Sequence, residues 1–278
     1  MNSSQFVKFI KTGEVSDINK LISYCIKENL FDIFNFYSEK YKISIPPKYK
    51  YLFDLIKKKS KNRFDHIVPY ISELNKNYLH CFVIKGPVTS KYIYGDYYTR
   101  LYDDFDLIVP TNEYSLMHQI LENKNFKNAF ITDNNNDKHS YDFAYKIKGE
   151  DIVYSKLEND IEIGFEVRDS IRELNNNQLC LIFKNLEESK YNEFSFYHPN
   201  LDYTIILQIV YSYMAYFTEY GILNKYKIKY LIELYMLVST HQYDLKKIYE
   251  LCKEIHIEDM YFKVIDYYNL IFNNKNDI

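Results

Sequence analysis

The chain has 278 residues, of which 47% are hydrophobic and 26% charged, so it is long and apolar enough to bury a sizeable core. Its formal net charge of −3 excludes the strongly basic surface that is typical of proteins that bind duplex nucleic acid, although a local basic channel stays possible. Its four cysteines are far apart and form no CxxC pair, which argues against a disulfide framework or a zinc site and fits a reducing compartment.

The sequence gives no sign of a targeting or membrane segment. Its first residues lack the apolar stretch of a signal peptide. The longest uncharged run, between Asp202 and Glu219, is too short and too polar to span a bilayer. We therefore expect a cytoplasmic protein with no membrane partner.

Residues 1–75 are predicted to form an N-terminal helical region. Apolar side chains such as Ile18, Leu21 and Cys25 recur with the spacing of one helix face. The prolines within 45–47 interrupt this pattern, and amphipathic helical spacing then resumes.

Short apolar runs separated by turns begin near residue 79 and are typical of strands. The predicted strands lie within 80–86, 102–109, 126–132, 141–148, 151–157 and 161–167, and a helix is predicted to begin at Thr111. We assign 76–170 to an α/β core. Helical spacing returns beyond about residue 170, so 171–278 is predicted to be a C-terminal helical lobe. The expected fold class is α+β, a small mixed sheet flanked by N-terminal helices and this lobe.

An Asp-x-Asp pair in the second predicted strand is the most informative local feature. Side chains alternate across a strand, so Asp104 and Asp106 share one face while Phe105 and Leu107 enter the other. Two neighbouring carboxylates repel each other, and a divalent cation between them removes that cost. Mg²⁺ is the natural choice because it binds one or two carboxylates together with substrate phosphates.

Two-metal phosphoryl chemistry usually requires a third carboxylate from a neighbouring strand. Asp160, Glu162 and Glu166 lie on one face of the strand predicted at 161–167. We predict Glu162 as the third ligand because it sits in the middle of the strand, away from the fraying ends. The alternative for all these side chains is an exposed strand face with solvated carboxylates.

These residues resemble a known family. The segments that carry the resemblance are Lys85-Gly86, Tyr94, Arg100 and Asp104-Phe105-Asp106-Leu107-Ile108-Val109. At these spacings they resemble the broad bacterial family of nucleotidyltransferase family proteins, within the DNA-polymerase-β-like superfamily. That family has a later strand of the form hydrophobic-acidic-hydrophobic-His-aromatic, which 161–165 resembles with Gly164 in place of the histidine. The resemblance covers about 66–167 and extends more loosely to about 240.

The resemblance implies transfer of a nucleoside monophosphate from an NTP, dependent on Mg²⁺ or Mn²⁺, with release of pyrophosphate. It implies that Asp104, Asp106 and Glu162 hold the metal ions. It also implies that Gly86 lets the backbone approach the triphosphate, and that Lys85 or Arg100 neutralises phosphate charge. The alternative for Arg100 is an ion pair with an aspartate at 103 or 104, and for Lys85 a solvated strand end.

The acceptor side departs from the family pattern. The family's helical lobe often carries a His and an Arg…Asp pair, where this chain has Tyr211 or a neighbour, and Lys229 with Glu233. The acceptor is left open as a small molecule, a peptide or a protein. Two other interpretations stay possible, a non-catalytic nucleotide-binding module and a toxin or defence transferase that acts on RNA 3′ ends. The acidic net charge disfavours RNA.

Overall fold

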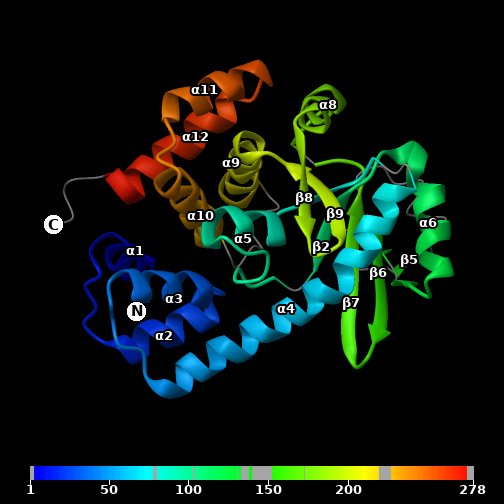
Figure 1. The fold of residues 1–278 in the computed structure, drawn as a ribbon. Helices are drawn as coiled ribbons and strands as arrows, with labels where there is room; N and C mark the ends of the chain where they lie inside the picture. Colours follow the sequence, from blue (N-terminus) through cyan, green and yellow to red (C-terminus); the bar gives the residue numbers. More distant parts are fainter. Residues whose placement is uncertain are drawn as a thin grey trace.

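The computed structural model describes residues 3–77, 80–102, 104–129, 131–132, 138–139, 152–171, 173–218 and 227–273. Within these ranges the chain forms a group of N-terminal helices, a five-stranded mixed sheet and a C-terminal group rich in helices (Figure 1). The predicted α+β class is confirmed. The strand expected at 141–148 lies outside the described residues.

The N-terminal region contains three short helices and one long one. They are α1 (Ser3–Thr12), α2 (Ile18–Lys27), α3 (Phe31–Lys40) and α4 (Pro47–Lys76). Asp17 caps α2 by accepting a hydrogen bond from the amide of Lys20, and a proline opens α4, where its missing N–H costs nothing. The 30-residue α4 runs from the small helices to the sheet (Figure 1).

The sheet has the strand order β1-β2-β7-β6-β3. These strands are β1 (Phe82–Ile84), β2 (Phe105–Ile108), β3 (Lys127–Ala129), β6 (Ile152–Glu158) and β7 (Ile161–Arg168). The central pair β2–β7 is parallel, and the other pairs are antiparallel. A small ladder joins β4 (Ile131–Thr132) to β5 (Lys138–His139). The helix α5 (Gly86–Tyr94) follows β1, and η1 (Thr111–Glu113) leads from β2 into α6 (Tyr114–Asn123).

The two faces of the sheet differ in chemistry because successive side chains alternate. Phe105 and Leu107 of β2 and Phe165 and Val167 of β7 are buried in one apolar core with α4 and α6. The alternate residues of the same two strands point to the opposite face, and they include Asp106. On these two strands, the face that packs on α4 and α6 is therefore apolar, and the opposite face carries the polar side chains.

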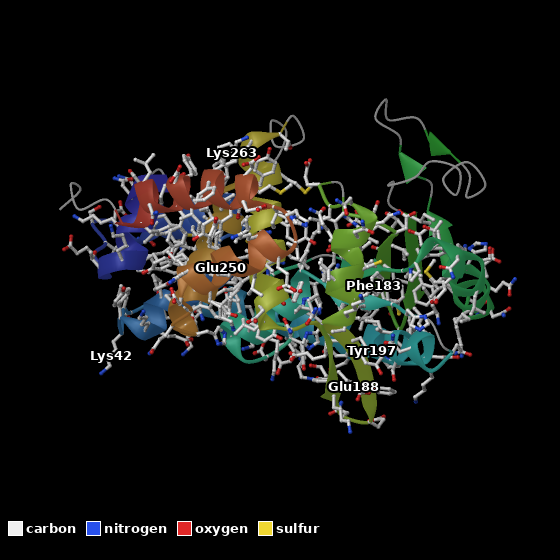
Figure 2. All side chains as sticks on the ribbon, turned by 90° about the horizontal axis from the view of Figure 1, so that it is seen from above. Lys42, Phe183, Glu188, Tyr197, Glu250 and Lys263 are labelled. Atoms are coloured by element: carbon white, nitrogen blue, oxygen red, sulfur yellow. The ribbon has the colours of Figure 1, made fainter. Side chains whose placement is uncertain are left out.

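The region beyond residue 170 was expected to be helical, and that expectation is wrong for 186–199. A hairpin of β8 (Leu186–Tyr191) and β9 (Phe194–Pro199) follows α8 (Asn176–Lys184). Its turn begins at Asn192, whose φ of 54° suits the tight turns that join antiparallel strands. Phe196 is buried against Phe64 of α4, so tertiary packing decides the strand. Figure 2 shows Glu188 and Tyr197 on this hairpin at one side of the molecule.

The remaining helices form the lobe. They are α9 (Leu201–Phe217), α10 (Lys227–Thr240), α11 (Leu245–Glu254) and α12 (Glu258–Tyr268), followed by the π-helical turn η3 (Asn269–Asn273). Their buried side chains join those of α1, α2 and α3 in one continuous core. Within the described ranges, every helix falls short of the length or the apolar character that a bilayer crossing requires.

Candidate metal centre

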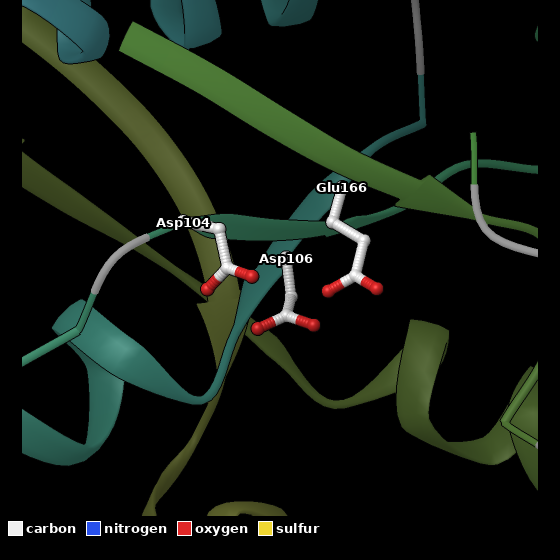
Figure 3. Close-up of side chains that lie close together, drawn as sticks. All are labelled: Asp104, Asp106 and Glu166. Carbon is white, nitrogen blue, oxygen red and sulfur yellow. The ribbon is translucent and has the colours of Figure 1, made fainter. Parts of the chain in front are cut away.

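Three carboxylates meet on the polar face of the sheet. Asp106 of β2 and Glu166 of β7 are directly paired across the parallel ladder, and Asp104 lies two residues before Asp106. One carboxylate oxygen from each residue lies within 4.8 Å of the others. Figure 3 shows the three side chains pointing toward one another. Asp106 is buried and Asp104 is exposed, so the cluster can be reached from solvent at one side.

Lys85 contributes a cation from the end of β1. Ile84 is paired with Asp106, so the next residue leaves the sheet beside the cluster. The Lys85 Nζ donates a hydrogen bond to Oδ1 of Asp106 at 2.7 Å and lies 5.0 Å from the ring centroid of Tyr211. Its backbone has φ 54°, a strained value for a residue with a side chain, of the kind found at functional sites. The solvated strand end that the sequence left open is not observed, because only 18% of this side chain is exposed.

Arg168, which is not among the residues predicted from the sequence, supplies a second cation. Its Nη2 lies 3.1 Å from Oδ1 of Asp106 and 3.0 Å from Oε1 of Glu166. Burial alone would raise the pKa of Asp106, but Lys85 and Arg168 outweigh burial and hold that pKa below its usual value. Asp106 therefore stays ionised in the folded protein.

The donor set fits a hard divalent cation. It consists of carboxylate oxygens only, which Mg²⁺ and Mn²⁺ prefer to nitrogen or sulfur ligands. Three carboxylates face the two cations Lys85 and Arg168, so the group keeps an excess of negative charge. The residues present thus suit a Mg²⁺-type ion.

Glu162, the predicted third ligand, is not part of this cluster. It lies opposite Leu157 of β6, is exposed, and precedes Glu166 by four residues, a separation of about 13 Å along a strand. The register of the parallel pair, which periodicity could not supply, places Glu166 beside Asp106 instead. The first four positions of the family pattern then fit 165–168, with Arg168 at the histidine position and Asp169 in place of the aromatic residue. Gly164 has a packing role, because a Cβ there would lie 3.1 Å from the carbonyl oxygen of Tyr154.

Gly86 opens α5 directly after Lys85. A Cβ on Gly86 would lie 3.1 Å from Cγ of Tyr102, so the ring of Tyr102 occupies the space that a side chain would need. Pro87 follows in the first turn, where a proline is well tolerated. The helix therefore begins one residue after Lys85, which contacts Asp106, and its first-turn N–H groups not already bonded within the helix are those of Gly86 and Val88.

Arg100 does not join the cluster through an ion pair with Asp104. Its Nε lies 2.7 Å from Oε1 of Glu233 in α10, and the Glu233 side chain is only 1% exposed. The main-chain amide of Arg100 donates to Oγ of Ser90. Residue 103 lies outside the described ranges. Arg100 thus connects the segment before Asp104 to the helical lobe.

Tyr211 of α9 covers the cluster from the lobe side. Its ring lies under Lys85, and within the described part of the chain its buried hydroxyl has no hydrogen-bond partner. Burial raises the pKa of Tyr211 above its usual value, so the hydroxyl keeps its proton and can donate a hydrogen bond. Tyr94, by contrast, packs edge-on against Phe36 and serves the core.

Comparison with known proteins gives one family and several similar structures. The model of a family described as uncharacterised nucleotidyltransferases matches residues 64–273. The crystal structure of an antigenic nucleotidyltransferase-like protein from Paracoccidioides brasiliensis is similar over 63% of this chain and 77% of that protein, with 12% identity and a TM-score of 0.42. The solution structure of the antibiotic-resistance factor ANT(2'')-Ia is similar over 77% of this chain and 97% of that protein, also with 12% identity and a TM-score of 0.42. A search of the curated proteins finds no match.

Proposed function

The chain belongs to the family of uncharacterised nucleotidyltransferases, and on this premise we propose that it moves a nucleoside monophosphate from an NTP to an acceptor hydroxyl or similar group. We propose that the reaction depends on Mg²⁺ or Mn²⁺ and releases pyrophosphate. The observation that carries this proposal is the convergence of Asp104, Asp106 and Glu166 on one face of the parallel pair β2–β7.

These three carboxylates would hold the metal, with Glu166 rather than Glu162 as the third ligand. Bound there, Mg²⁺ neutralises charge on the triphosphate and lowers the pKa of the acceptor hydroxyl. The protein's part is to fix the oxygens of Asp106 and Glu166 on two strands of a rigid sheet, which is a more precise support than a loop, while Asp104 directly precedes β2.

Lys85 and Arg168 are the cations placed for the triphosphate. Both contact Asp106, so they lie beside the carboxylates to which an ion and its phosphates would come. A guanidinium and an ammonium form strong charge-assisted hydrogen bonds with phosphate oxygens. The protonated Tyr211 hydroxyl adds a neutral donor on the lobe side, and the N-terminus of α5 at Gly86 presents backbone N–H groups of the kind that favour phosphate.

In the proposed reaction an acceptor oxygen forms a bond to the α-phosphorus while the bond from that phosphorus to the bridging oxygen breaks. The pyrophosphate leaves with the bonding electrons, and the acceptor releases its proton. Positioning and charge neutralisation, rather than a covalent enzyme intermediate, supply the rate enhancement of such phosphoryl transfers. The residues around Asp106 suit that task.

The experiment is transfer of label from an NTP. The protein is incubated with Mg²⁺ or Mn²⁺, each α-³²P-labelled NTP and a cell extract that has been separated into small molecules, protein and RNA. We expect label in the small-molecule or protein fraction, with the matched variant Asp106→Asn inactive. Label in RNA alone would favour the RNA 3′-end alternative. The transferase proposal fails if no NTP binds or is consumed at any metal concentration.

A further inference from the structure

The segment that leads into Asp104 is fixed by charged side chains from two distant parts of the chain. The amide of Leu101 donates a hydrogen bond to Oδ2 of Asp32, on α3, at 3.1 Å. The carbonyl oxygen of Leu101 accepts from Nζ of Lys229, on α10, at 3.4 Å, and the same Nζ lies 3.4 Å from Oδ2 of Asp32. Both main-chain polar groups of one residue, three positions before Asp104, are therefore held by a single ion pair.

This ion pair is buried deeply enough to be costly. The Asp32 side chain is 0% exposed and that of Lys229 is 4% exposed. Burial lowers the pKa of Lys229 from its usual value, and Asp32 offsets only part of that effect. In addition, Oδ1 of Asp32 is buried with no hydrogen-bond partner among the residues that the structure describes.

Stability alone does not account for such an arrangement. A buried ion pair contributes little net stability compared with well-packed apolar residues, and an unsatisfied buried oxygen is itself destabilising. What the pair does provide is a fixed position for the main chain of Leu101. Arg100, the preceding residue, is anchored separately by Glu233, so the segment is held at two successive residues.

We propose that Asp32 is a positioning residue for the metal centre, acting with Lys229 through the main chain of Leu101 to set the place of Asp104. Asp32 lies outside the residues 64–273 that match the family, so the N-terminal helices of this chain complete the site from outside the family's common core. This inference rests on the proposed metal-binding role of Asp104.

The test uses Mn²⁺ alone, which needs no knowledge of the acceptor. In the double variant Asp32→Leu/Lys229→Met, apolar side chains of similar size replace both charges, so neither charge is left buried alone and the hold on Leu101 is lost. We expect a Mn²⁺ affinity about tenfold weaker than that of the wild type, as for loss of an outer partner of a metal ligand. Faster hydrogen exchange of the Leu101 amide should accompany the loss. The control is Asn35→Leu, because Asn35 is also on α3 but bonds to Glu39 of the same helix.

A second variant keeps the test decisive if the double variant does not fold. Asp32→Asn retains an oxygen for the Leu101 amide and is expected to keep most of the Mn²⁺ affinity and the amide protection, whereas Asp32→Ala has no acceptor and is expected to lose both. Equal Mn²⁺ affinity of these two variants would overturn the inference. The inference is overturned if the double variant, folded, binds Mn²⁺ as the wild type does, or if Asn35→Leu weakens binding equally. Absence of Mn²⁺ binding by the wild type would overturn this inference and the proposed function together. Mn²⁺ binding that depends on Asp106 but not on Asp32 would overturn this inference alone.

Discussion

The pair Glu166 and Glu162 gives the sharpest test of the candidate metal centre. Both are glutamates on the same face of β7, four residues apart, so Glu166→Gln and Glu162→Gln are chemically identical changes at different distances from Asp106. Each replaces a carboxylate by an amide of the same shape. Only the change at 166 removes a charge from the group whose oxygens lie within 4.8 Å of one another.

The size of the effect follows from that distance. An ion held among these oxygens would lie within about 4 Å of the Glu166 carboxylate, and even one unit of its charge at that distance interacts by about 4 kcal/mol at the effective dielectric constant of a protein near its surface. A loss of that size corresponds to a factor of about 1,000, and because the glutamine oxygen can still coordinate a metal, we expect Mn²⁺ affinity to fall about 100-fold in Glu166→Gln. The exposed Glu162 lies about 13 Å away along the strand, beyond the screening length at physiological salt, so its variant should change affinity less than about twofold.

The assay is titration of each variant with Mn²⁺ alone, followed by electron paramagnetic resonance of the free ion. If Glu162→Gln weakens Mn²⁺ binding about as much as Glu166→Gln, the proposal that the metal ligands lie where β2 and β7 pair Asp106 with Glu166 is refuted. Equal thermal unfolding of the two variants without metal is the check that neither change acts through the fold.

Three further outcomes are expected. Replacing the cations, as in Lys85→Met or Arg168→Met, should tighten binding of Mn²⁺ alone at least about threefold, because a competing charge is lost, and should weaken binding of an NTP analogue; calorimetry of each ligand separates the two effects. Gly86→Ala should lower the unfolding free energy by about 1–3 kcal/mol, because the new Cβ would press on the ring of Tyr102, and chemical denaturation measures this loss. Mg²⁺ at 100 times its dissociation constant should stabilise the wild type by about 2.7 kcal/mol, seen as a rise in Tm that is absent in Asp106→Asn.

Part of the candidate metal centre could be predicted from the sequence because local rules decide it. Alternation along the strand predicted at 102–109 puts Asp104 and Asp106 on the same face, and the two carboxylates do lie together although Asp104 directly precedes β2. The third carboxylate depends on the register between β2 and β7, two strands that are far apart in the chain. No local pattern sets that register, and β7 carries acidic residues at several positions of one face, so mid-strand placement pointed to Glu162 rather than Glu166.

The same limit explains the cations and the buried anchors. Arg168 follows Glu166 by two residues. It could have been identified in the sequence by fitting the family pattern to 165–168 instead of 161–165. Arg100 and its partner Glu233 are separated by 133 positions, so their ion pair could not be inferred from spacing. The sequence predicts helix where the β8–β9 hairpin lies, because these strands are short and partly polar and show no clear strand pattern. Burial of Phe196 against α4 decides the observed conformation.

The core that the first three helices share with the lobe links the two ends of the chain. During synthesis, residues such as Phe9 and Phe34 leave the ribosome long before Leu207 and Leu237, which complete the same core. The apolar faces of α1, α2 and α3 therefore stay partly exposed to solvent until the residues of the lobe have been synthesised. Contacts between residues so far apart in the sequence slow folding and leave intermediates with exposed apolar surface that are prone to aggregate. We therefore expect the nascent chain to depend on chaperones more than is usual for a chain of this length.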